Sequence, residues 1–146
     1  MADYHIYMTR KDINPQIKKD LESEFKGLKY KELKGVERFG ERKNIYMESF
    51  AETDRIEVWQ GDTAIRNNTE IVLTLVFIGE NRRQAYHDFV DYISVGEFEY
   101  TDDIRKRKFD FIFKNALEPS EDTLKGTEYI QVDFVLQNLN GQTSDI

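Results

Sequence analysis

Apolar and polar positions are ordered most clearly between residues 69 and 96, TEIVLTLVFIGENRRQAYHDFVDYISVG. Over 70–78, apolar residues occupy both faces of an alternating pattern, which is typical of a central strand covered on both sides. Gly79 and two polar residues then interrupt the pattern. The next apolar residues recur at helical spacing, which predicts an amphipathic helix over 81–95 that ends at Gly96. The apolar stripe of this helix consists of Ala85, Tyr86, Phe89, Val90 and Ile93.

Further strands are predicted around this unit, because apolar and polar residues alternate there with a period of two. Short strands are expected in NIYMESF (44–50) and RIEVWQGD (55–62), separated by a turn at AETD, and in EFEY (97–100). Longer strands are expected in KRKFDFIFK (106–114) and EYIQVDFVLQN (128–138). The polar stretch 115–127 is expected to be the loop that joins these two strands in an antiparallel hairpin.

The first 43 residues are expected to hold a strand, a short helix and a charged segment. The strand is DYHIYM (3–8). Asn14 as N-cap, apolar residues at every fourth position and a stop at Gly27 predict the helix. The charged segment LKYKELKGVERFGERKN (28–44) is expected to be exposed or mobile, and residues 142–146 are expected to be a frayed tail.

These elements predict a single α+β domain over residues 1–146. Its core, 44–141, is expected to be a mostly antiparallel β sandwich or barrel with helix 81–95 packed across it, and the N-terminal helix would be a second, shorter one. A chain of 146 residues is long enough for a hydrophobic core, to which ten Phe and eight Tyr residues contribute large buried areas.

Charge and cysteine content narrow the range of functions. The net charge of −7 argues against general affinity for nucleic acid, which depends on Lys and Arg neutralising phosphates. The chain has no Cys, which excludes disulfides, zinc held by thiolates and a cysteine nucleophile. It has no secretory signal of the usual type and no apolar run of about 18 residues. We therefore expect a protein made and folded in a cytoplasm, without membrane contact.

Candidate catalytic and metal-binding groups are few. The two histidines, His5 and His87, lack the spacing of metal ligands, so a solvated or core-edge position is the better interpretation. Glu97 and Glu99 lie on one face of a predicted strand, but nothing near them marks a cleft or a base. Motifs for an activated serine and for phosphate binding are absent. We expect no catalytic residue, metal or cofactor, and hence no enzyme.

A basic cluster and the single tryptophan are the candidates for an interface between subunits. The cluster consists of Arg105, Lys106, Arg107 and Lys108, and alternating phenylalanines follow it. A strand on which nucleic-acid bases stack has a similar composition, but these aromatics alternate as a core face does and nearby aspartates cancel much of the positive field. Charge pairing across strands or a contact between subunits explains the cluster better. Trp59 fits either an interface or the core.

The order of elements over about 44–141 resembles the tail-tube fold of long-tailed phages, found in the tail tube and distal tail protein families of phages and prophages. The similarity is one of layout and residue character, and the first 43 residues have no counterpart in it. The segments that carry it are an extended hairpin region, TEIVLTLVFIG, NRRQAYHDFVDYIS, GEFEY, RKRKFDFIF and EYIQVDFVLQNLNG.

This resemblance implies a structural component of a phage or prophage tail. In such a virion tail, subunits made in the bacterial host cytoplasm form homo-oligomeric rings that stack into a tube with other tail proteins. DNA passes through the lumen without specific binding, and a negative wall would keep it from sticking. One alternative is a monomeric β-barrel that binds a small apolar ligand among its aromatic residues. A third hypothesis is an enzyme that uses a pair of carboxylates.

Overall fold

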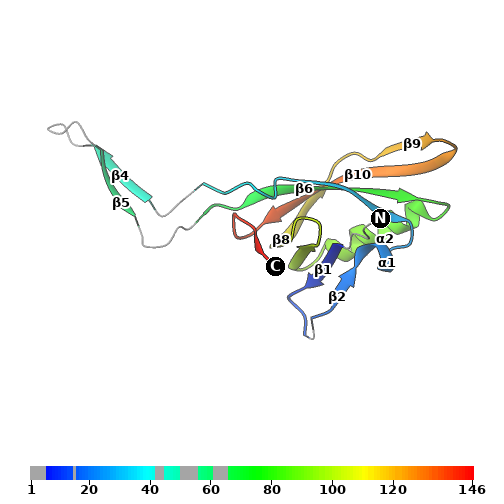
Figure 1. Ribbon diagram of the computed structural model, residues 1–146, viewed down its shortest axis with the longest axis horizontal. Coiled ribbons are helices and arrows are strands. Elements are labelled where there is room, and N and C mark those ends of the chain that lie inside the picture. The colour runs from blue at the N-terminus through cyan, green and yellow to red at the C-terminus, as the bar shows by residue number, and fades with distance from the viewer. Residues whose placement is uncertain (1–5, 15, 42–44, 50–55, 61–65) are drawn as a thin grey trace.

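The computed structural model describes residues 6–14, 16–41, 45–49, 56–60 and 66–146. Most of these residues lie in antiparallel strands, and the longer helix packs across one face of the main sheet (Figure 1). The predicted α+β, mostly antiparallel fold is therefore confirmed.

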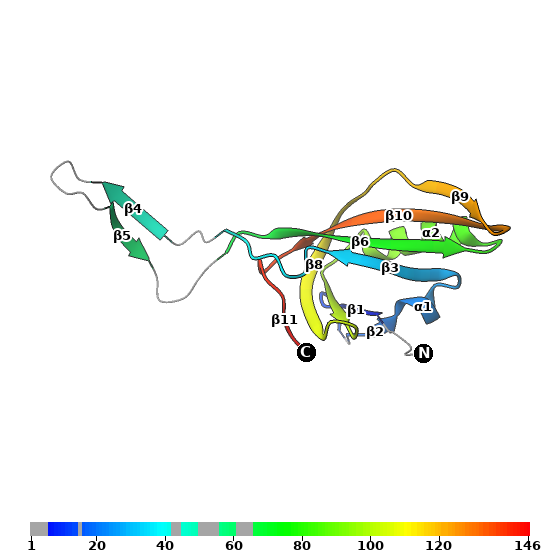
Figure 2. The same cartoon turned by 45° about the horizontal axis from the view of Figure 1, so that its top comes forward.

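The main sheet contains nine strands, and a separate pair, β4 and β5, lies apart from it (Figures 1 and 2). The strand order is β2-β1-β7-β8-β10-β6-β3, with β9 paired to β10 and β11 paired to β8. The elements are β1 (Ile6–Arg10), β2 (Lys18–Asp20), α1 (Leu21–Glu24), β3 (Leu28–Lys34), β4 (Ile45–Ser49), β5 (Ile56–Gln60), β6 (Thr69–Ile78), α2 (Arg82–Ile93), β7 (Phe98–Asp102), β8 (Arg107–Ala116), β9 (Ser120–Leu124), β10 (Thr127–Asn138) and β11 (Ser144–Asp145).

The strand predicted over 70–78 is β6, and it is central as expected. It lies between β10 and β3 and pairs with β10 along its whole length. Its apolar residues on the inner face are fully buried, and those on the outer face are half-buried. The fully buried residues are Ile71, Leu73, Leu75 and Phe77.

The helix predicted over 81–95 is α2, which packs against β6, β10 and β3. It buries Ala85, Phe89 and Ile93 from the predicted stripe. The ring of Phe89 meets that of Phe134 on β10 edge-on, with centroids 5.0 Å apart. Since full burial of one Phe side chain contributes about 1.5–3 kcal/mol, these aromatic contacts account for much of the attachment of the helix.

The N-terminal helix predicted between Asn14 and Gly27 is confirmed as a short helix, α1, but it is much shorter than the predicted stretch. Residues 18–20 form β2, which pairs with β1, and only Leu21–Glu24 are helical. Asp20 caps this short turn by accepting a hydrogen bond from the backbone N–H of Glu22. Pairing with a neighbouring strand outweighs the local helical spacing, and Ile17, the first residue of the expected stripe, is 52% exposed.

The charged segment 28–44 is not simply exposed or mobile, because its first part is β3. Leu28 and Leu33 are buried in the core while the lysines between and beside them face solvent. A bulge between Tyr30 and Glu32 shifts the register against β6. This bulge breaks the alternation of apolar residues, which explains why the strand was not predicted.

Two further corrections concern the C-terminal third. The expected loop 115–127 contains β9, which pairs with β10 through a two-residue turn at Lys125 and Gly126. Both turn residues have positive φ, as a type I′ hairpin turn requires.

The tail 142–146, expected to be frayed, forms β11 against β8. The antiparallel pairing predicted between the strands at 106–114 and 128–138 is confirmed as β8 with β10.

Candidate functional site

The basic cluster lies at the turn between β7 and β8, and a buried aspartate organises this turn. The side chain of Asp102 is 1% exposed. Its Oδ1 accepts hydrogen bonds from the backbone N–H groups of Ile104, at 2.8 Å, and Arg105, at 3.3 Å. Asp is favoured at such turns because its side chain can replace a backbone acceptor. These two hydrogen bonds hold the turn on which the cations of the cluster lie.

Arg105 connects this turn to β3, the last strand in the order of the main sheet. Its Nη1 donates to Tyr30 Oη at 3.0 Å and to Asp102 Oδ2 at 3.1 Å. Its Nη2 donates to the carbonyl oxygen of Leu33 at 3.1 Å. The hydrogen bond to Tyr30, followed by that to Asp102, raises the pKa of Arg105 above its usual value. This guanidinium is therefore engaged within its own chain.

Arg107 has a similar role towards the C-terminal tail. Its Nε donates to Thr143 Oγ1 at 3.0 Å, and its Nη2 donates to the carbonyl oxygen of Thr143 at 2.8 Å. It also forms an ion pair with Asp145, the residue opposite it in the β8–β11 pairing. Thr143 Oγ1 in turn donates to the carbonyl oxygen of Val36 at 3.1 Å. This is the cross-strand charge pairing that the sequence left open as one explanation of the cluster.

The two lysines of the cluster are placed differently from its arginines. Lys106 is exposed at the tip of the turn, with a positive φ of 57°. Lys108 is half-buried on β8, opposite Ser144 of β11. The cluster therefore consists of two arginines that connect parts of the chain and two lysines, of which Lys106 is the more accessible.

Trp59 belongs to the separate β4–β5 hairpin, 45 or more residues from the cluster in the chain and apart from it in space (Figures 1 and 2). The predictions of strands in NIYMESF and RIEVWQGD are confirmed, while the turn predicted at AETD lies outside the described residues. The register pairs Tyr46 with Trp59 and Glu48 with Glu57.

The chain leaves the main sheet for the hairpin and returns to it at one place, which we call the glycine-lined neck. It is formed by Gly40, Asn67 and Gly141. The N–H of Gly40 donates to the carbonyl oxygen of Gly141 at 2.7 Å. The guanidinium of Arg66 donates to the carbonyl oxygen of Gly40 at 3.1 Å. A Cβ atom on Gly40 would lie 1.7 Å from the carbonyl oxygen of Asn67, and one on Gly141 would lie 2.3 Å from the same oxygen. Only glycine fits at these two positions.

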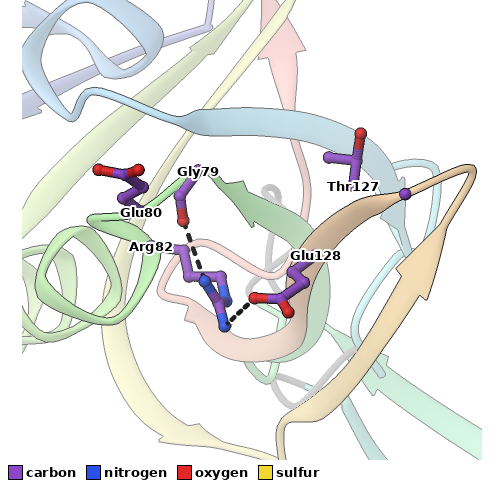
Figure 3. A pocket seen from close by; sticks show the side chains of 6 residues that line it. Gly79, Glu80, Arg82, Thr127 and Glu128 are labelled. Carbon is purple, nitrogen blue, oxygen red and sulfur yellow. Dashed lines mark hydrogen bonds and ion pairs between the residues drawn. The ribbon is translucent and has the colours of Figure 1, made fainter.

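The strand-turn-helix at 69–96 borders a shallow pocket of about 320 Å³ between the β6–α2 turn and the start of β10 (Figure 3). Arg82 donates to the carbonyl oxygen of Gly79 at 3.2 Å and forms an ion pair with Glu128 at 2.9 Å. Because Glu128 is 63% exposed, this ion pair contributes at most about 1 kcal/mol. Glu80 also lines the pocket, and two carboxylates make it unsuited to a phosphate.

A second hollow of about 410 Å³ lies on the outer face of β3, β6 and β10. Val76, Ile78 and Tyr129 form its apolar part, and Lys31 and Lys125 border it. This hollow is open to the surface. Inside the fold, the aromatic side chains contact one another: the rings of Phe77 and Phe134 are 6.4 Å apart. These ring contacts are typical of a packed core, so they give no support to the alternative of a ligand-binding barrel.

The candidate catalytic groups are not brought together. Glu97 is exposed, and Glu99 forms an ion pair with Lys11 at 3.8 Å. His87 is exposed on α2, with its ring 5.5 Å from that of Tyr86, and His5 lies outside the described residues. Across the described ranges, no three His, Cys, Asp or Glu side chains are grouped as metal ligands. Nor does any described helix have the length and apolar character needed to span a membrane.

Comparison with known proteins identifies this architecture. No family model matches the chain, and no curated protein matches its sequence. Solved structures do match. The Dit protein (gp 19.1) of phage SPP1, described as a paradigm of the hub adsorption apparatus in phages that infect Gram-positive bacteria, superposes with a TM-score of 0.52 at 13% identity. The chain has the fold of phage hub and baseplate proteins.

Two structures of the phage P2 baseplate in its activated conformation, one with Ca and one with Sr, match with TM-scores of 0.55 at 16% and 14% identity. The chain covers 52% of the SPP1 protein and 44% of each P2 baseplate chain, so it spans about half the length of the proteins that it matches. The SPP1 match includes 97% of this chain. The expectation that the first 43 residues have no counterpart in the fold is therefore wrong.

Proposed function

We propose that this protein is a structural subunit of a phage or prophage tail, which assembles with copies of itself, as a ring or tube, and with other tail proteins. The observation that carries this proposal is the shared fold, which extends over 91–97% of the chain in hub and baseplate structures. The subunit would be made in the cytoplasm of the bacterial host and would reside in the virion tail. It would act by assembly, without catalysis.

The β4–β5 hairpin supports the homo-oligomer. An isolated two-stranded hairpin is at best marginally stable in water. No third strand pairs with this hairpin among the described residues. A neighbouring subunit or another tail protein would supply the surface that covers it. Trp59, one of the two candidate interface features of the sequence, would then lie within the interface, since aromatic residues are enriched in interfaces.

For the basic cluster we propose a divided role. Lys106 and Lys108 would contact a neighbouring subunit directly. Arg105 and Arg107 would act on the same interface by holding the β7–β8 turn and the C-terminal tail in place, because their guanidinium groups are bonded within the chain. The net charge of −7 is compatible with DNA passing through a ring without specific binding, since like charges repel.

Molar mass in solution tests the proposed assembly. We would measure it by light scattering on a size-exclusion column at several protein concentrations, and examine the largest species by negative-stain electron microscopy. Masses that are several times 17.3 kDa, with ring-shaped particles, are expected. A monomer at every concentration would contradict self-assembly of this chain.

A variant with residues 45–60 replaced by a short Gly-Ser linker is the matched test of the hairpin. It should fold and remain monomeric under conditions where the natural sequence associates. Association undiminished in this variant would show that the hairpin is not the contact between subunits.

A further inference from the structure

The strand β3 forms one end of the main sheet, and among the described residues only β6 pairs with it. End strands of this kind present unpaired N–H and C=O groups to which another chain can add a strand. A seven-residue strand is long enough for such an addition. The polar groups on the free side of β3 therefore decide whether the sheet can be extended at this end.

The backbone bonds show which residues of β3 face away from β6. The N–H of Ile78 donates to the carbonyl oxygen of Gly27 at 2.9 Å, so residue 27 faces β6. Because the direction alternates along a strand, Leu28 and Tyr30 face the free side. The bulge after Tyr30 then changes the phase of the alternation.

The N–H groups of Leu28 and Tyr30 on this free side already have partners. The N–H of Leu28 donates to the carbonyl oxygen of Phe25 at 3.1 Å. The N–H of Tyr30 donates to Glu22 Oε1, from α1, at 3.2 Å. A carboxylate acceptor makes the second of these a charge-assisted hydrogen bond, about twice as strong as a neutral one.

Arg105 binds the free side of β3 in its second half. Its guanidinium donates to the carbonyl oxygen of Leu33 and, at the same time, to the hydroxyl of Tyr30. The buried carboxylate of Asp102 fixes this guanidinium at 3.1 Å. Side chains from α1 and from the β7–β8 turn thus take the positions that an added strand would need.

We propose that Glu22 and Arg105 are edge caps, which close β3 to any added strand and direct contacts between copies to other surfaces. This inference goes beyond the proposed function, because it concerns the edge of one subunit whether or not that subunit belongs to a tail. It implies that a ring of these subunits does not extend its sheet through β3.

Amide hydrogen exchange of the natural protein, followed residue by residue by NMR, is the first test. The amide of Tyr30 should exchange at least tenfold more slowly than an unprotected amide, although no strand pairs with it on that side. Exchange at the unprotected rate would overturn the proposal. This readout does not depend on oligomeric state, so a protein that is monomeric throughout would contradict the proposed function and leave the edge caps unaffected.

Variants test the consequence for association. Glu22→Ala and Arg105→Ala, alone and combined, should accelerate exchange at Tyr30 and cause concentration-dependent association that binds thioflavin T. Glu24→Ala and Asp103→Asn remove neighbouring charges that form no hydrogen bond with β3, and they serve as controls. Folded double variants with the same association as these controls would overturn the proposal. If the alanine variants fail to fold, Glu22→Gln and Arg105→Lys provide weaker caps in which Tyr30 exchange should still accelerate.

Discussion

The pair β6–β10 and the pair β4–β5 are both antiparallel with unbroken register, yet their surroundings differ completely. The first pair is flanked by further strands and covered by α2, with Leu75 and Phe134 fully buried. The second pair stands alone among the described residues. Strand pairing by itself contributes little, since water satisfies the same hydrogen bonds in the unfolded chain. The comparison therefore separates a pair that neighbouring strands and a helix stabilise from a pair that has no such neighbours among the described residues.

The largest effect is expected in the core. Phe134→Ala removes a ring that contacts Phe77 and Phe89, and it should lower the free energy of unfolding by about 3–5 kcal/mol. Chemical denaturation followed by circular dichroism measures this change. Val95→Ala is the control, because Val95 is 65% exposed and its truncation should change stability by less than about 0.5 kcal/mol. Similar losses in the two variants would show that the aromatic core is not where stability resides.

A smaller effect is expected at the contact between the β7–β8 turn and β3. Asp102→Asn keeps the shape of the buried side chain but removes its charge, so the bonds to Arg105 and to the turn weaken. We expect a loss of about 1–2 kcal/mol, measured by the same denaturation. The paired variant Asp103→Asn, one residue further, should have a much smaller effect. Equal losses in the two variants would mean that general charge, and not this contact, stabilises the turn.

Replacing the hairpin should have almost no effect on the stability of the remainder. The linker variant that lacks residues 45–60 should unfold with a free energy within about 1 kcal/mol of that of a monomeric natural protein, because β4 and β5 form a sheet separate from the main one. Denaturation at low concentration makes this comparison. A large loss would show that the hairpin supports the main sheet, and the distinction between the two regions would fail.

The last expected effect is a change in the free energy of unfolding that occurs only at alkaline pH. Burial, with a further contribution from Glu24, raises the pKa of Tyr92 to about 12. An unfolded Tyr loses its proton near pH 10, whereas the folded one retains it. The free energy of unfolding should therefore fall as pH rises from about 10 to about 12. Tyr92→Phe should reduce this slope, and the hairpin-lacking protein should keep it. An unchanged slope in Tyr92→Phe would contradict the assignment to this residue.

The parts of the fold that the sequence predicts well are those with long, regular patterns. The alternation in β6 and the helical stripe of α2 are uninterrupted, so tertiary contacts reinforce the local preference. The bulge between Tyr30 and Glu32 conceals β3, and β11 is too short to have a pattern. At α1, pairing of β2 with β1 overrides a helical spacing.

The candidate site was harder to predict, because its contacts join distant segments. The sequence identifies Arg105 as part of a basic cluster, but its partners Tyr30 and Leu33 lie more than seventy residues earlier in the chain. No local spacing indicates that contact. Similarly, Arg107 is paired with Asp145, which the sequence assigned to a frayed tail. A pattern can show that a charge is present, but only the fold shows what it faces.

The glycine-lined neck has a consequence for the history of this fold. Gly40 and Gly141 have no room for a side chain, because a Cβ atom on either would meet the carbonyl oxygen of Asn67. A substitution at either position would therefore shift the chain where it leaves the main sheet and returns to it. We therefore expect glycine at these two positions to be retained in relatives whose other residues have diverged.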